Sequence, residues 1–236
     1  VFLEKPMALT EKDCLMLAKL VRQKNLFFTL GLNRRYSPLV QRAKKQINPQ
    51  DSLVLHYSIL EKEKSHKRWI DEEGGRIIYM FCHIIDVATY LIGAEPVSVY
   101  ATHAVGSVAS SRQTPVSAIV TFDNGALLHI FYQLVDAQVH TSEHIEIFNK
   151  DNYLSIKDFS EYTFRELGAQ DVVSSHTIDC GHKEEIQRIA NMLHTHTVDS
   201  TIVTLKDAVR ATRFPFYVLE SISQRRVVNI KPPSFL

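Results

Sequence analysis

The opening of the chain alternates short apolar runs with one amphipathic segment. Residues 1–3 and 26–32 (LFFTLGL) are typical of buried strands, because parallel strands covered on both faces are almost continuously hydrophobic. Between these runs, Thr10 begins the sequence TEKD, which is typical of a helix N-terminus, and a leucine stripe continues to about Lys24. The order strand, helix, strand predicts an α/β start.

The next part of the chain predicts two helices around a strand and a loop. Ser37 and Pro38 are typical of the cap and first position of a helix. Residues 51–60 (DSLVLHYSIL) predict a strand, and the charged stretch 61–75 predicts a loop of a length that is often functional. Residues 76–92 are apolar almost throughout, which indicates a largely buried helix that ends at a glycine.

From Val97 onward the apolar period becomes two, and the pattern predicts strands over residues 97–101, 116–122, 126–135, 145–148 and 153–156. The sequence Asp123-Asn124-Gly125 is a strong hairpin signal. Two further helices, 183–194 and 205–223, precede a closing strand at 226–230. The expected fold class is therefore the end of a parallel α/β domain, followed by an α+β domain with a large, mainly antiparallel sheet backed by helices.

One predicted strand carries a quaternary signal. In residues 127–135 (LLHIFYQLV), one face presents only Leu, Ile and Tyr, and the other presents Leu127, His129, Phe131 and Gln133. A solvent-facing side is normally more polar than this second face. Packing on another subunit would explain it, and a covering loop would explain it equally well.

Composition excludes several classes of protein. The 236 residues carry 27 Lys+Arg against 26 Asp+Glu, so nothing indicates a nucleic-acid or membrane-surface partner. The three cysteines are far apart, which makes a disulfide framework improbable and favours a cytoplasmic location. No apolar stretch is long enough to span a bilayer, and the start does not resemble a secretory signal.

The motifs of several enzyme classes are absent from these residues. None of the eight glycines is separated from another by one residue, so the dinucleotide-binding pattern GxGxxG cannot be written, and the P-loop pattern is also missing. No GxSxG hydrolase motif occurs. Four residues could be assembled on paper into a zinc site, but their spacing is not that of a usual structural site, so no metal is expected: Cys180, His182, His194 and His196.

Several segments, taken in order, resemble the Gfo/Idh/MocA family of NAD(P)-dependent sugar and polyol oxidoreductases. They are EKPMALT, GLNRRYSP, RW…EEGGRII…CHIID, EPVSVYA, FDNGALLHI and GHKEEIQRIANML, and they cover essentially the whole chain. The resemblance implies that residues 1–32 are the C-terminal remnant of a Rossmann domain. Residues 33–236 would form the substrate-binding and oligomerisation domain, with a final helix able to pack back on the Rossmann part.

The resemblance also implies a first set of site residues. Lys5 would polarise the reacting hydroxyl or carbonyl, with Glu4 and Pro6 framing the nicotinamide at the end of a strand, where open α/β sheets bind ligands. His83 would exchange a proton with the substrate oxygen, since the pKa of histidine lies near neutral pH. Asp86, one helical turn later, would orient the imidazole, bind substrate or cap the backbone. The alternatives are a surface loop for Lys5 and a core position for His83.

One position departs from the family pattern. Many relatives carry an acid four residues before this histidine, followed by small residues, whereas this chain has Tyr79, Met80 and Phe81. Tyr79 is one turn from His83 and could share a proton network, although a tyrosine with a pKa of about 10 is a poor base at neutral pH. The bulky neighbours predict a smaller or altered pocket.

Three further residues are substrate-binding candidates: Arg34, Tyr36 and Trp69. An arginine after a strand can bind phosphate or sugar hydroxyls, and an indole can stack on a sugar face. The alternative is an ion-paired surface, which is favoured for Arg35, and a packing role for Trp69.

The function expected is hydride transfer between NAD or NADP and a secondary alcohol or carbonyl of a sugar, polyol or nucleotide sugar, in a cytoplasmic homo-oligomer. Without a phosphate-binding loop, the 236 residues alone are expected to bind neither cofactor tightly and to be inactive. The alternative is a non-catalytic sugar-binding or oligomerising module descended from the same family, which Tyr79 and the absent glycine pattern favour.

Overall fold

A nine-stranded mixed sheet dominates the computed structural model, which describes residues 1–48, 53–62, 74–104, 115–135, 141–195, 197, 199–233 and 235. The strands are β3 (Val54–Lys62), β4 (Pro96–His103), β5 (Val116–Phe122), β6 (Leu127–Val135), β7 (Ser142–Phe148), β8 (Asn152–Lys157), β9 (Glu161–Glu166), β10 (Ala169–Ser174) and β11 (Val228–Asn229). Their order is β10-β9-β8-β7-β3-β6-β5-β4-β11. Only β3 and β6 pair in parallel in this described sheet, so the expectation of a large, mainly antiparallel sheet is confirmed.

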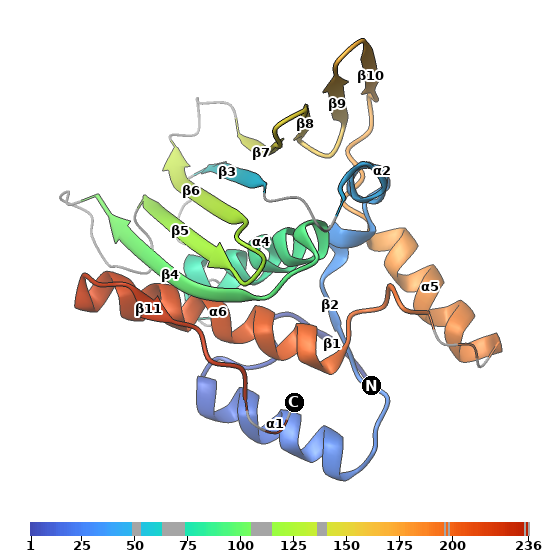
Figure 1. Cartoon of the computed structure of the whole chain (residues 1–236). Helices are drawn as coiled ribbons and strands as arrows, with labels where there is room; N and C mark the ends of the chain where they lie inside the picture. Colours follow the sequence, from blue (N-terminus) through green and yellow to red (C-terminus); the bar gives the residue numbers. More distant parts are fainter. Residues whose placement is uncertain are drawn as a thin grey trace.

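Two helices, α4 (Arg76–Ile92) and α6 (Leu205–Gln224), back one face of the sheet (Figure 1). Almost every residue of α4 is buried, which explains why its sequence is apolar on all sides. Gly75 and Gly93 flank α4 with φ of 91° and 77°, conformations that glycine adopts without steric cost. These two glycines mark the predicted helix, and its predicted bounds are confirmed.

The N-terminal residues form a small parallel unit of β1 (Phe2–Glu4), α1 (Glu11–Gln23) and β2 (Thr29–Gly31). The Thr10 hydroxyl caps α1 by accepting from the Asp13 amide, as predicted. The predicted strand over residues 26–32 was too long. Leu26 and Phe27 are 47% and 40% exposed, because the Leu26 amide bonds back to the end of α1 and delays the strand.

Helix α6 packs on this N-terminal unit. Arg213 of α6 donates to the Glu11 carboxylate at 2.6 Å, and the Met7 amide donates to the Thr212 hydroxyl at 3.2 Å. Figure 1 shows α6 lying between α1 and the large sheet. The final helix therefore contacts both layers of the molecule.

Three helical segments lie beside the sheet: η1 (Asn33–Tyr36), α2 (Pro38–Gln46) and α5 (His182–Thr195). Pro38 begins α2 as predicted. The Ser37 hydroxyl, however, makes no capping bond, because it is buried without a hydrogen-bond partner in the described part of the chain. Ser37 is nevertheless the N-cap residue of α2, so its predicted position at the helix start is confirmed.

Strands β9 and β10 were not predicted. Their sequences, EYTFRE and AQDVVS, are short and polar. In β9 only Tyr162 and Phe164 turn inward and are buried, whereas β10 is largely exposed at the edge of the sheet. Two alternating apolar residues are too few to distinguish such a strand from a loop in the sequence.

The face of the sheet opposite α4 and α6 is rich in exposed apolar side chains. Leu128, Ile130 and Tyr132 of β6 are fully buried beneath the sheet, and Leu127 on the other face is 38% exposed. Neighbouring strands add exposed side chains on that outer face: Val54, Tyr100, Ile119 and Phe148. We call this surface the open face. No helix in the described part of the chain is long and apolar enough to cross a membrane.

Gly181 sets the docking of α5 on η1. Its φ is +88°, and a β-carbon there would lie 2.4 Å from the Asn33 carbonyl oxygen and 2.5 Å from the Ser37 amide nitrogen. These neighbours are backbone atoms, which cannot rotate away. Only glycine therefore allows this contact.

Gly181→Ala is expected to lower the free energy of unfolding by at least about 3 kcal/mol, because a left-handed backbone penalty adds to a steric clash. Gly168→Ala is the control, because its φ is +81° but nothing lies within 4 Å of the added carbon. It should cost only about 1–2 kcal/mol. Urea unfolding measures both, and equal losses would contradict the proposed contact.

Candidate active site

Chemically reactive side chains gather where β1 and β2 end. Lys5 follows β1, Arg34 lies on η1 directly after β2, and Tyr79 and His83 lie on α4. The carboxyl ends of parallel strands are the usual ligand-binding edge of an α/β sheet. The structure thus brings together four of the residues predicted from the sequence.

Lys5 rests on the first turn of α4. Its ammonium nitrogen lies 2.9 Å from the centroid of the Tyr79 ring and donates to the Tyr79 carbonyl at 3.2 Å. A cation over an aromatic face is attracted by the ring quadrupole. Tyr79 therefore positions the Lys5 ammonium.

His83 is an electrically neutral imidazole in this site. Its side chain is buried, and Nδ1 has no hydrogen-bond partner among the described residues. Burial, assisted by the positive charges of Arg34 and Lys5 and by His182, lowers the pKa of His83 well below its usual value. The imidazole can therefore accept a proton but does not hold it at neutral pH.

His182 is a site residue that sequence reasoning did not assign to catalysis. It begins α5, and its Nδ1 lies 3.5 Å from the Asn33 amide nitrogen, which also donates to the Cys180 carbonyl at 2.7 Å. The described residues contain no group of three or more His, Cys, Asp or Glu able to hold a metal. His196, of the rejected zinc set, lies outside the described residues.

Arg34 is fixed by a carboxylate that the sequence analysis missed. Its Nε and Nη2 donate to the two oxygens of Glu143 at 2.7 and 2.9 Å, and the Tyr57 hydroxyl donates to the same carboxylate. Bidentate pairing of this kind fixes the plane of a guanidinium. Glu143 shares the inward face of β7 with the buried Ile145 and Ile147, and an acid in that register is the signal that could have revealed it.

A cavity of about 530 Å³ opens beside this ion pair. Its lining includes Arg34, Tyr79, Met80, Glu143, Asp158 and Cys180. Met80 thus borders the space, whereas Phe81 is fully buried and packs edge-on against Tyr132. The cavity is mixed in character, with apolar walls and a fixed cation, which suits a polyhydroxylated ligand.

Two predicted substrate-binding residues lie in the core. Both oxygens of Asp86 accept hydrogen bonds from Arg35, and the Tyr36 hydroxyl accepts from the Val203 amide at 3.0 Å. These contacts favour structural roles, and substrate contact by either residue stays a prediction. Arg35 was expected at an ion-paired surface but is only 4% exposed, so its pair is buried. Trp69 lies outside the described residues.

Two carboxyl groups lie near the ends of the strands. Glu4 packs against Gly31, where an added β-carbon would be 2.9 Å from a Glu4 oxygen. Glu185 of α5 is 3% exposed, and burial, with a smaller contribution from Glu4, raises its pKa to about 7. The sequence analysis missed Glu185. The predicted cofactor-framing residues Glu4 and Pro6 flank Lys5 directly in the sequence.

Comparison with known proteins finds similarity to oxidoreductases in sequence and in fold. Residues 52–153 match the family model of the GFO/IDH/MocA C-terminal domain. The uncharacterized oxidoreductase YrbE of Bacillus subtilis is 24% identical over 98% of this chain and 71% of its own length. Inositol 2-dehydrogenase of Rhizobium meliloti is 32% identical over 44% of this chain and 33% of its own length.

Solved structures share the same fold. An NAD binding oxidoreductase from Klebsiella pneumoniae superposes with a TM-score of 0.79 at 16% identity, covering 98% of this chain and 73% of that one. UDP-N-acetylglucosamine 3-dehydrogenase from Acidithiobacillus ferrooxidans gives a TM-score of 0.76 at 19% identity, covering 94% and 70%.

The matched segment and the shared fold make this chain similar to proteins of the oxidoreductase class. Residues 52–153 belong to the Gfo/Idh/MocA family as its C-terminal domain, and the resemblance seen in the sequence is confirmed.

Burial of His83 predicts a pH-dependent stability. The unfolded chain protonates this histidine near pH 6.5 and the folded chain does not, so acid favours unfolding. Below pH 6.5, His83 should lower the free energy of unfolding of the parent by up to about 1.4 kcal/mol for each pH unit. His83→Asn should lack this contribution, so its stability should fall less steeply in acid. Urea unfolding at pH 7.5, 6.5 and 5.5 measures this slope. The exposed His176→Asn control should keep the parent slope, and a parent slope in His83→Asn would contradict the buried neutral imidazole.

Proposed function

We propose that the protein is a nicotinamide-dependent oxidoreductase that acts on a secondary alcohol or carbonyl of a sugar, polyol or nucleotide sugar. The observation that supports this most is the neutral, buried His83, which lies in the electrostatic range of Lys5 and Arg34. The family membership of residues 52–153 supports the same chemistry. We further propose that β1, α1 and β2 belong to a Rossmann domain, which their parallel pairing supports.

Each residue would have a distinct task. Lys5 would donate to the reacting oxygen and stabilise negative charge on it, and neutral His83 would accept the hydroxyl proton during oxidation. Because two cations and His182 disfavour an imidazolium at this position, His83 would release that proton readily. Arg34, held by Glu143, would bind substrate oxygens, and Tyr79 would keep Lys5 in place.

The residues at the strand ends fit the nicotinamide end of a cofactor. Glu185 Oε1 is a buried acceptor with no hydrogen-bond partner in the described part of the chain, and it lies near Glu4 at the end of β1. An amide donor would satisfy such an oxygen. The bound nicotinamide would accept or supply the hydride, and either NAD or NADP agrees with these residues. The glycines of this chain do not supply the phosphate loop.

A sugar-like substrate is supported by the cavity beside Arg34. Its volume of about 530 Å³ accommodates a ring with several hydroxyl groups. Two similar proteins, inositol 2-dehydrogenase and UDP-N-acetylglucosamine 3-dehydrogenase, are named for a polyol and a nucleotide sugar. We also propose a cytoplasmic location, which the three free cysteines support.

One observation favours a second candidate, a non-catalytic sugar-binding module. The Lys5 ammonium is already engaged by the ring and the carbonyl of Tyr79. A catalytic lysine would have to exchange these contacts for the substrate oxygen. Binding of a polyol without turnover would establish this alternative.

Turnover tests the proposal in the protein as encoded. Formation of reduced cofactor from NAD or NADP is measured with a panel of cyclic polyols and sugars. His83→Asn should lower kcat by about 10²–10⁴-fold with little change in cofactor affinity. His176→Asn, an exposed histidine, should match the parent. Unchanged turnover in a well-folded His83→Asn protein would end the catalytic assignment.

We propose that the open face joins two or more copies of this chain. Its apolar side chains form two cross-strand groups: Tyr100 pairs with Ile119, and Val54 pairs with Leu127 and Phe148. All five are at least 38% exposed. Exposed apolar side chains gathered on one face of a sheet favour an interaction site.

Sedimentation at micromolar concentration should show a dimer or a larger assembly. Ile119→Glu places a charge on the open face at a residue that is 50% exposed, and it should produce a monomer. Ile186→Glu on α5 is the matched control at 51% exposure and should leave the assembly unchanged. A monomeric parent chain would refute the interface.

A further inference from the structure

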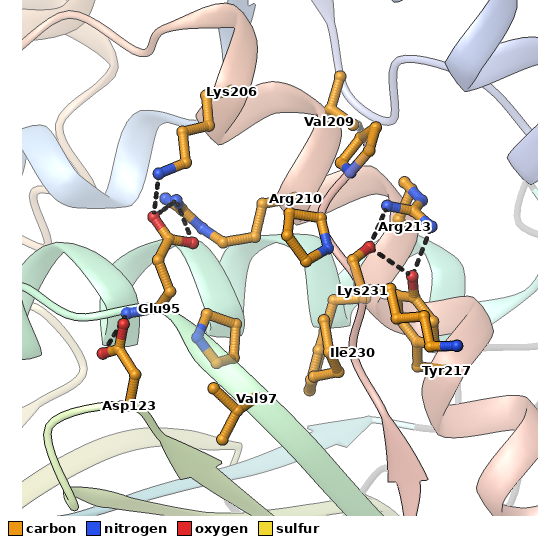
Figure 2. A pocket seen from close by; sticks show the side chains of 14 residues that line it. Glu95, Val97, Asp123, Lys206, Val209, Arg210, Arg213, Tyr217, Ile230 and Lys231 are labelled. Atoms are coloured by element: carbon orange, nitrogen blue, oxygen red, sulfur yellow. Dashed lines mark hydrogen bonds and ion pairs between the residues drawn. The ribbon is translucent and has the colours of Figure 1, made fainter. Parts of the chain in front are cut away.

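A second cavity lies on the outer side of α6, against the start of β4. Its volume is about 290 Å³, near the lower end of the roughly 300–1,000 Å³ typical of small-molecule sites. Its walls come from α6, from the turns at Glu95 and Asp123, and from residues 230–233 after β11. Figure 2 shows these side chains around the space. None of Lys5, Arg34, Tyr79 or His83 lines it.

The chain after β11 is tied down as one wall of this cavity. The Ile230 amide donates to the Val97 carbonyl at 2.9 Å, which continues the pairing of β11 with β4. The Lys231 carbonyl then accepts from Arg213 at 2.8 Å and from the Tyr217 hydroxyl at 3.1 Å. Residues 230 and 231 are therefore held to β4 on one side and to α6 on the other, and they form a fixed wall of the cavity.

Most of the lining is apolar and much of it is flat. It includes the rings of Pro96, Phe214, Tyr217, Pro232 and Pro233, together with aliphatic side chains. Flat apolar walls favour a planar ring over a chain with many hydroxyl groups. The lining thus differs from that of the candidate active site.

Arg210 provides a buried cation at the inner end. Its side chain is 10% exposed, and its Nη1 donates to the Glu95 carboxylate at 3.1 and 3.2 Å. Its Nη2 donates to Asp207, while its Nε has no hydrogen-bond partner in the described part of the chain. A buried donor without an acceptor is unfavourable, so this guanidinium has an unfilled capacity for a ligand oxygen.

The charged groups of the lining favour an anion. The basic residues are Lys206, Arg210, Arg213 and Lys231, and the acids are Glu95 and Asp123. Both acids are already engaged, because Glu95 binds Lys206 and Arg210, and Asp123 accepts from the Glu95 amide. Figure 2 shows Lys206 and Arg210 meeting at the same Glu95 carboxylate. The basic residues are paired too, Arg210 with Asp207 and Arg213 with Glu11. The preference for an anion therefore depends on the excess of basic over acidic side chains in the lining and on Arg210 Nε, which has no partner among the described residues.

We infer that this cavity binds a small aromatic carboxylate, with the ring between the proline and tyrosine faces and the carboxylate at Arg210. The volume accommodates one ring with a short acidic substituent. Arg210 would exchange part of its contact with Glu95 for a contact with the ligand carboxylate. Lys206 would remain paired with Glu95. This site is independent of the proposed active site.

Calorimetric titration of the 236-residue chain with benzoate tests the inference. Saturable binding with a Kd of about 1 mM or tighter is expected for a ligand of this size. Benzamide is the neutral probe of the same shape and should bind at least about tenfold more weakly, since it lacks the charge-assisted bonds. No saturation by about 10 mM benzoate, or stronger binding of the cation benzamidine, would overturn the proposal.

Variants locate the binding site. Arg210→Gln should weaken benzoate binding at least about tenfold, whereas Arg42→Gln, another aspartate-paired arginine but outside the cavity, should not. Val97→Trp is the second test, because Val97 lines the cavity yet is 40% exposed, so the larger ring fills the space with little strain. It should abolish binding in a protein with a normal thermal melt. Parent-like affinity in Val97→Trp would refute the location.

Discussion

A buried ion pair between Arg35 and Asp86 joins the elements that carry the candidate active site. Arg35 is on η1 and Asp86 is on α4, and their side chains are 5% and 1% exposed. Arg35 Nε donates to Asp86 at 2.9 Å, and its Nη1 reaches Asp207 of α6 at 3.3 Å. Removing two charges from water is costly, so such a pair persists only where the geometry satisfies both groups.

Asp207 extends this pairing into α6. Its carboxylate also closes the capping box with Thr204 at the start of the helix. Burial opposes ionisation, but Arg35 and Arg210 lower the pKa of Asp207 to about 2. One arginine thereby connects η1, α4 and α6.

The position of the catalytic candidates follows from this connection. Asp86 is one helical turn from His83, and Arg35 is adjacent to Arg34 in the sequence. The turn of η1 sends Arg35 inward to α4 and Arg34 outward to Glu143 of β7. Fixing Arg35 therefore fixes the cation that faces His83, and that cation contributes to the lowered pKa of the imidazole.

Local signals in the sequence predicted much of the fold. The bounds of α4 follow from its flanking glycines, and the start of α1 follows from Thr10. The division of β6 into two faces follows from its alternation. These features depend on neighbouring residues, and a single sequence contains them.

Long-range partners could not be predicted in the same way. Glu143 is 109 residues from Arg34, and Asp86 is 51 residues from Arg35, so no spacing relates them. The burial of Arg35 was missed because an arginine is normally exposed unless a partner from elsewhere is supplied. Lys5 and His83 were proposed from family resemblance, and the structure adds the neighbours that affect their charge.

A double-mutant cycle on Arg35 and Asp86, measured by urea unfolding, tests this ion pair most directly. Arg35→Met and Asp86→Leu should each lower the free energy of unfolding by about 3–5 kcal/mol, because each leaves a buried charge without its partner. The double variant should lose much less than the sum, since two apolar side chains can pack together. Additive losses, or single losses below about 1 kcal/mol, would show that the pair does not hold η1 against α4.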